Sequence, residues 1–150
     1  MIERIVSGGQ TGVDRAALDA ALELALPCGG WCPRGRRAED GPIDARYPLT
    51  ETPSDDYSQR TAWNVRDSDG TLVLTRDAPI GGTALTVDVA ERLHKPHLVV
   101  DLARGAGPRA AREWLVRNAV RVLNVAGPRE SGMPGIYADA LAFLRAVLAG

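Results

Sequence analysis

The chain has 150 residues, of which 45% are hydrophobic and 25% are charged, and its formal net charge is -1 at pH 7. This size and composition are typical of one globular domain, which we place at residues 1–150 and which needs no disulfide or metal to fold. The near-zero charge argues against a nucleic-acid-binding protein, and no apolar run is long enough to span a membrane. We expect a cytoplasmic protein, because the start of the chain lacks the pattern of a signal peptide.

The two cysteines, Cys28 and Cys32, are separated by three residues, and no second pair accompanies them. This spacing and the number of ligands do not fit a zinc site, and His94 and His97 flank an expected turn. We therefore expect free thiols and no metal held by protein side chains.

Short apolar runs alternate with helix-favouring segments along the whole chain. In chain order we expect strand 2–6, helix 13–25, strand 28–32, helix 57–67, strand 71–75, helix 83–94, strand 97–101, helix 108–118, strand 120–125 and helix 136–148. The strands are continuous apolar runs, which is typical of a parallel sheet that is covered on both faces. We predict a single three-layer α/β domain with a five-stranded, mostly parallel sheet in the order 2-1-3-4-5.

The first expected strand ends in a glycine loop, Ser7-Gly8-Gly9-Gln10-Thr11-Gly12. Adjacent glycines let a ligand approach the backbone, and the helix that follows offers unpaired N–H groups and the positive end of its dipole. The loop favours a phosphate or carboxylate site, although it is neither a P-loop nor a complete dinucleotide fingerprint, and a plain tight turn is the alternative. Thr11 and Asp14 also have the spacing of a capping box.

A second glycine loop, Ile80-Gly81-Gly82-Thr83, follows the third expected strand and opens the next helix. In the order 2-1-3-4-5 the first and third strands are neighbours, so the two loops would meet at the carboxyl edge of the sheet. Two such loops in equivalent places predict one shared site for a phosphate group.

Arg60, Asn64 and Asp67 share one face of helix 57–67. Near the start of that helix, Arg60 could pair with a phosphate or a carboxylate through both prongs of its guanidinium. The alternative is a polar stripe that faces solvent.

Two further loops could form the rim of the site. The long loop 33–55 carries Arg34, Arg36 and Arg37, which could close over an anion, and the loop after the fifth strand carries Arg129 and Ser131. Mixed charges in both loops make ordinary solvated turns the alternative.

Four segments together resemble the putative molybdenum carrier family: Ser7–Arg15, Gly30–Gly41, Asn64–Asp69 and Gly81–Thr86. They occur in a fixed order over essentially the whole chain. The resemblance implies a Rossmann-like fold, with a molybdenum cofactor or a nucleotide as a possible bound ligand. It also places the chain at a distance from the lysine decarboxylase-like phosphoribohydrolases and the DNA-processing protein DprA.

The phosphoribohydrolases carry an arginine before a P-G-G-x-G-T-x-x-E loop, and the glutamate serves the active site. Asp56–Arg60 resembles the arginine-bearing segment, and Gly81-Gly82-Thr83 resembles the loop. In this correspondence Thr86 stands where the glutamate belongs, and a threonine hydroxyl is a poor acid or base at neutral pH. The resemblance therefore implies that anion binding is retained and hydrolysis is not.

The leading hypothesis is a binding or carrier protein for a phosphate-bearing, nucleotide-like or pterin-type ligand, with the molybdenum cofactor as one candidate. The alternative is a nucleoside monophosphate glycosidase that uses Asp14, Asp88 or Glu91. A third class is a protein that binds other proteins through the loop around Trp31. We expect a homo-oligomer, because small alanine-rich α/β domains often pair through their helices.

Overall fold

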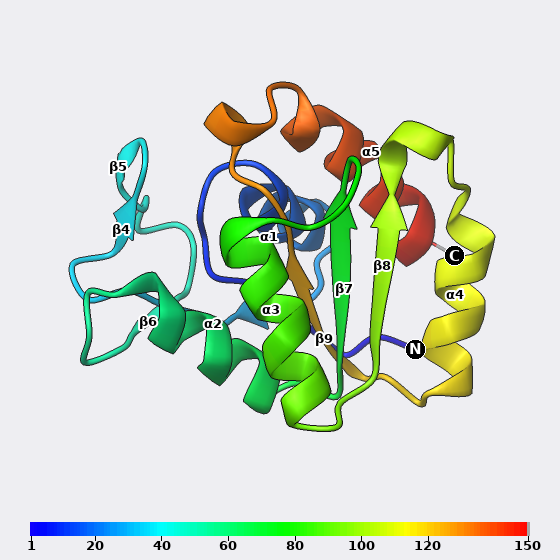
Figure 1. Cartoon of the computed structure of the whole chain (residues 1–150), viewed down its shortest axis with the longest axis horizontal. Helices are drawn as coiled ribbons and strands as arrows, with labels where there is room; N and C mark the ends of the chain where they lie inside the picture. Colours follow the sequence, from blue (N-terminus) through cyan, green and yellow to red (C-terminus); the bar gives the residue numbers. More distant parts are fainter. Residues whose placement is uncertain (150) are drawn as a thin grey trace.

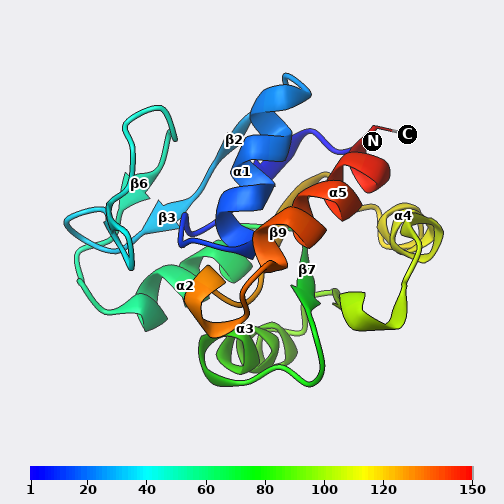
Figure 2. The same ribbon diagram turned by 90° about the horizontal axis from the view of Figure 1, so that it is seen from above.

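The computed structural model describes residues 1–149, which form three layers (Figures 1 and 2). The central sheet contains five parallel strands: β1 (Arg4–Val6), β2 (Cys28–Gly29), β7 (Gly70–Thr75), β8 (His97–Asp101) and β9 (Val122–Ala126). The α-helices of these residues are α1 (Val13–Glu23), α2 (Tyr57–Arg66), α3 (Gly81–Arg92), α4 (Pro108–Arg117) and α5 (Ile136–Leu148). In Figure 2, α1, α4 and α5 cover one face of the sheet, and α2 and α3 cover the other. The predicted α/β class is confirmed.

The strand order is β2-β1-β9-β7-β8, which is 2-1-5-3-4 when the five strands are numbered along the chain. The predicted order 2-1-3-4-5 is therefore wrong, because β9 lies between β1 and β7. A local apolar run specifies a strand but not the strands beside it. The position of each strand in the sheet depends on how much of its apolar surface that position buries. β9 takes a central place with Leu123 and Val125 fully buried, whereas β8 lies at an edge with Val99 38% exposed.

Numbered from β7 instead of β1, the same sheet does have the order 2-1-3-4-5. β7 is then the first strand, followed by β8, β9, β1 and β2. The end of α5 and the start of β1, which this numbering joins, lie on the same side of the molecule in both figures. The strand order reverses between β7 and β9, which moves the expected ligand crevice to the carboxyl ends of those two strands.

The segment predicted as one strand at 28–32 is divided at Gly30. β2 pairs with β1, but β3 (Trp31–Cys32) pairs with β6 (Thr50–Glu51) in a separate small sheet. Gly30 has a φ of +129°, and a Cβ atom there would clash with the backbone of Ser7, so the chain can turn at this position only because it is a glycine.

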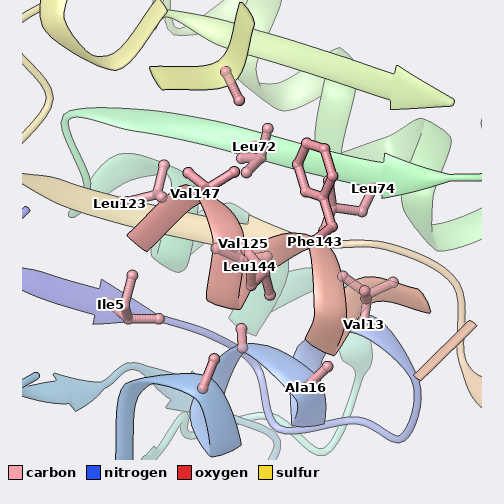
Figure 3. Packing of buried hydrophobic residues seen from close by; sticks show 14 of the residues in the cluster. Ile5, Val13, Ala16, Leu72, Leu74, Leu123, Val125, Phe143, Leu144 and Val147 are labelled. Carbon is pink, nitrogen blue, oxygen red and sulfur yellow. The ribbon is translucent and has the colours of Figure 1, made fainter. Parts of the chain in front are cut away.

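The two faces of the central sheet differ in character. Figure 3 shows the large apolar cluster between the sheet and helices α1 and α5, which includes Ile5, Leu72, Leu123 and Leu144. Side chains alternate along a strand, so the neighbours of Leu72 and Leu123 in sequence point to the α2–α3 face. Thr71 and Asn124 on that face are polar and buried. The apolar face anchors the fold, and the polar face is where a hydrophilic cavity can form.

The long loop 33–55 is ordered by its own hydrogen bonds and contains a hairpin of β4 (Arg37–Ala38) and β5 (Gly41–Pro42). The Arg36 guanidinium donates to four carbonyl oxygens within the loop, those of Ile43, Asp44, Tyr47 and Leu49. The Tyr47 hydroxyl donates to Asp19 of α1 at 2.6 Å and fastens the loop to the core. Among the described residues, no helix has both the length and the apolarity needed to cross a membrane.

Candidate functional site

A cleft of about 830 Å³ opens at the carboxyl ends of β7 and β9. It lies on the α2–α3 side of the sheet, and the loop after β9 forms its remaining wall. Its lining includes Gly8, Asp14, Arg60, Gly82, Thr86 and Asn124. Both the volume and the position, at the point where the strand order reverses, are those of a small-molecule site.

Arg60 extends from α2 into the wall of the cleft, where its guanidinium is held on three sides. Nη1 donates to Asp14 Oδ2 at 3.0 Å, and Cζ lies 5.2 Å from the centre of the Tyr57 ring. A Cβ atom at Gly8 would clash with the guanidinium, so any other residue at this position would displace Arg60. Nε is buried without a hydrogen-bond partner among residues 1–149. The cleft wall therefore holds a cation whose hydrogen-bonding capacity is incompletely used.

Asp14 is the carboxylate that accompanies this cation. Burial raises the pKa of Asp14, while Arg60 and the backbone N–H of Gln10 act in the opposite direction. The predicted capping box is wrong: α1 begins after Gly12 with no side-chain cap, and the Thr11 hydroxyl donates to Glu39 instead. Asp14 faces Arg60 because a buried cation is a stronger partner for a carboxylate than the N–H groups at the helix start.

Three N–H groups of the first glycine loop, residues 7–12, already have acceptors within the protein. The N–H of Ser7 donates to Gly29 O, that of Gly9 to Ser7 Oγ, and that of Thr11 to Gln10 Oε1. Gly8 and Gln10 line the cleft, whereas Ser7, Gly9, Thr11 and Gly12 do not. This loop positions Asp14 and Arg60, and half of its N–H groups are already bonded.

The second glycine loop is open. α3 begins at Gly81 without a side-chain cap, and both Gly81 and Gly82 are exposed at the cleft. Their N–H groups donate to no acceptor among the described residues, and a Cβ atom at either glycine would have nothing within 4 Å. Thr83, which is buried, continues the same wall. Both glycine loops reach one cleft although β9 separates β1 from β7.

The polar residues of α2 that follow Arg60 serve the structure. Asn64 Oδ1 accepts from the N–H of Trp31 at 2.7 Å, and its Nδ2 donates to Trp31 O at 3.0 Å. Asp67 accepts from Trp31 Nε1 at 2.8 Å and lies in a separate groove of about 340 Å³. Trp31 itself packs edge-to-face on Trp63, with the ring centres 4.8 Å apart. The amide of Asn64 and the indole N–H of Trp31 are therefore bonded within the protein and are not free to bind a ligand or a partner.

Of the residues expected at the rim of the site, only Arg129 lines the cleft. Ser131 lies outside it and binds Glu39 through its hydroxyl and its N–H. Arg34, Arg36 and Arg37 do not line the cleft either. Arg36 holds its own loop together, and Arg37 donates to Asp55 O at 2.9 Å.

The acidic groups considered for catalysis are also separated. Asp88 and Glu91 are exposed on α3 and do not line the cleft, so Asp14 alone of the three reaches it. The hydroxyl of Thr86 donates to Gly82 O at 3.1 Å. Cys28 and Cys32 lie away from the cleft, and burial raises the pKa of both thiols.

Sequence reasoning missed several polar residues of the cleft, among them Asn124 and Asp77. Asn124 interrupts the apolar run 120–125, and this interruption is the signal that could have revealed it. Asp77 follows β7 with a φ of +63° and is exposed at the cleft. Little in the local sequence distinguishes Asp77 from any loop aspartate.

Fold and cleft together define a Rossmann-like α/β protein with an open cleft at the carboxyl edge of its sheet. The chain belongs to the circularly permutated YpsA SLOG family, whose model matches residues 5–148. This description agrees with the strand order, which becomes 2-1-3-4-5 when the numbering starts at β7.

The chain is also similar to a protein of known crystal structure, a putative molybdenum carrier protein from Syntrophus aciditrophicus. The two share 46% sequence identity and superpose with a TM-score of 0.94, and the match covers 98% of this chain and 95% of the other. No curated protein matches the sequence.

Proposed function

We propose that this chain is a binding or carrier protein for a small phosphate-bearing ligand of the nucleotide or pterin type. The observation that carries the proposal is the uncapped start of α3, where Gly81 and Gly82 present free N–H groups to the cleft. A molybdenum cofactor belongs to this ligand class, and the similarity to a putative molybdenum carrier protein supports it as a candidate.

A comparison of the helix starts at this edge of the sheet supports α3 as the phosphate site. At α5, the Glu130 carboxylate accepts from the N–H groups of Gly135 and Tyr137 at 2.7 and 2.9 Å. At α1, the N–H of Val13 donates to Pro128 O at 3.2 Å, and Asp14 in the first turn disfavours a second anion there. Free N–H groups at a helix start, together with the helix dipole, favour an anion, and these conditions are met at α3.

Arg60 supplies the positive charge in this proposal. Its guanidinium is nearly buried, with 12% of the side chain exposed, and Asp14 engages it through a single hydrogen bond. A phosphate oxygen could pair with the remaining donors by a charge-assisted contact in a partly desolvated site. The cation and the open helix start would then hold two sides of one phosphate group.

The proposal is tested by measuring the binding of inorganic phosphate and adenosine monophosphate by calorimetry. Gly82→Asp should abolish binding of both, because it places a carboxylate in the open space at the start of α3. Gly107→Asp is the matched control: this glycine also lies at the start of a helix and has nothing within 4 Å of a Cβ atom, but it lies outside the cleft. Equal binding by the two variants would contradict the proposal.

A nucleoside monophosphate glycosidase is the second candidate function, and Asp14 is the observation in its favour. A buried carboxyl in a cleft, with burial acting to raise its pKa, is the kind of group that can serve as a general acid. Release of free base from adenosine monophosphate, abolished by Asp14→Asn, would establish this activity. We expect no such release, because Thr86 stands at the position of the catalytic glutamate in the enzymes that the chain resembles.

The cytoplasmic location and the homo-oligomeric state expected from the sequence stay predictions. Cell fractionation tests the first, and sedimentation equilibrium tests the second.

A further inference from the structure

Asn124 occupies an unusual place for an amide, in the middle of the central strand β9. Its neighbours across the sheet are Val6 of β1 and Thr71 of β7. The residue is 3% exposed, and the surface that it does expose belongs to the cleft. Such a position is normally filled by an aliphatic side chain.

The hydrogen-bonding capacity of this amide is only partly used. Nδ2 donates to Thr71 Oγ1 at 3.3 Å, and Oδ1 accepts no hydrogen bond from residues 1–149. Whichever way round the amide is turned, Thr71 satisfies one end and the other end faces the cleft. Among the described residues, the fully buried side-chain atom without a partner is Arg60 Nε, so the free end of the Asn124 amide is accessible from the cleft, where a ligand group can bond to it.

Two other polar side chains of the cleft lining are already engaged. Both ends of the Asn64 amide bind the backbone of Trp31, and the Thr86 hydroxyl binds Gly82 O. The third amide of the described cleft lining is that of Gln10, whose Oε1 accepts from the N–H groups of Thr11 and Glu39. Asn124 is therefore the amide of this lining that retains both an acceptor and a donor for a ligand.

The depth of Asn124 in the cleft sets the shape of that ligand. Asn124 is level with Thr71, four residues before β7 ends at Thr75, which is about 13 Å at 3.3 Å per residue. The open start of α3 lies beyond that end. A ligand that reaches both places has an anionic group at one end and a hydrogen-bonding group at the other.

We propose that Asn124 recognises the edge of a planar nitrogen heterocycle that carries a donor and an acceptor side by side. This inference rests on the proposed function, which places the phosphate of the same ligand at the start of α3. An amide pairs with such an edge through two hydrogen bonds, as asparagine does with adenine. Asn124 is thus the residue that selects the heterocycle, and Arg60 and α3 hold its phosphate.

The test compares adenosine monophosphate with ribose 5-phosphate, which has the same phosphate group but no base. Asn124→Leu removes the amide at similar volume and should weaken adenosine monophosphate binding about tenfold to a hundredfold, the range for one two-bond contact to a base. Ribose 5-phosphate should bind this variant as it binds the wild type. Asn118→Leu is the control, because Asn118 ends α4 and lies outside the cleft.

Two further variants separate recognition from a structural role. Thr71→Val removes the protein partner of Asn124 and should leave the preference for adenosine monophosphate over ribose 5-phosphate intact. Asn124→Asp offers acceptors only, so it should shift the preference towards guanosine monophosphate, whose ring edge has two adjacent donors. A structural role alone would not change which base is preferred.

Three results would overturn the inference: adenosine monophosphate binding that Asn124→Leu leaves unchanged, an equal loss of ribose 5-phosphate binding, or an unchanged base preference in Asn124→Asp. Failure of the proposed function looks different, because neither phosphate compound would then bind the wild type. Adenosine is the probe in that case. Adenosine binding that Asn124→Leu weakens upholds the role of Asn124, and no adenosine binding overturns it.

Discussion

The two glycine loops look alike in the sequence, but they do different work in the structure. In the first, atoms of neighbouring residues occupy the space that a side chain at Gly8 or Gly12 would need, and the N–H groups of Ser7, Gly9 and Thr11 have acceptors within the protein. In the second, Gly81 and Gly82 face open space and their N–H groups are free. A glycine pair before a helix can therefore mean close packing or an open anion site, and only the surroundings decide.

The largest expected effect concerns Arg60, which links the first loop to the cleft. Arg60→Ala leaves Asp14 buried without its partner, and breaking a buried pair in this way costs about 3 kcal/mol of stability. It should also weaken phosphate binding roughly tenfold to a hundredfold, and Arg60→Lys should restore only part of the affinity. Urea denaturation and calorimetry measure the two effects.

The control for Arg60 is the double variant Arg60→Ala with Asp14→Asn, which should regain much of the stability but none of the affinity. A single Arg60→Ala protein that binds adenosine monophosphate like the wild type would remove Arg60 from the site.

A smaller effect tests the packing role of the first loop against the open second loop. Gly12 has a φ of +77°, and a Cβ atom there would clash with the backbone of Pro128 and Arg129. Gly12→Ala should therefore cost about 2 kcal/mol, the scale of one strained backbone position. Gly82→Ala should change stability by less than about 1 kcal/mol, because its side chain enters open space. Equal losses in urea denaturation would show that the two loops do not differ in packing.

The smallest effect is the pH dependence that Asp14 contributes. Because burial raises the pKa of Asp14 in the folded state, the folded protein holds this proton at a pH where the unfolded chain has released it. Stability should therefore fall as pH rises from about 3.9, the ordinary aspartate value, through the raised pKa. Denaturation at several pH values should show this fall in the wild type and its loss in Asp14→Asn. A fall of equal size in the variant would assign the effect to another group.

Much of the fold followed from local sequence patterns. The apolar run that became β8 and the helix that became α5 were both predicted with the bounds that the structure has, because continuous apolar runs and helical periodicity are local signals. The strand order could not be predicted from local patterns, because β9 pairs with β1, which lies more than a hundred residues earlier in the chain. Its place was decided by which strand best fills the centre of the sheet.

The candidate site, too, was predictable from the sequence only in part. The sequence by itself determined that glycine loops precede helices and that Arg60 stands near the start of a helix, since these are facts of composition and spacing. Only the tertiary structure decided that Asn64 holds Trp31, that Glu39 engages Thr11 and Ser131, and that Asn124 faces the cleft. Whether an N–H group or an amide is free depends on partners that are distant in sequence, and folding alone brings those partners into contact or keeps them away.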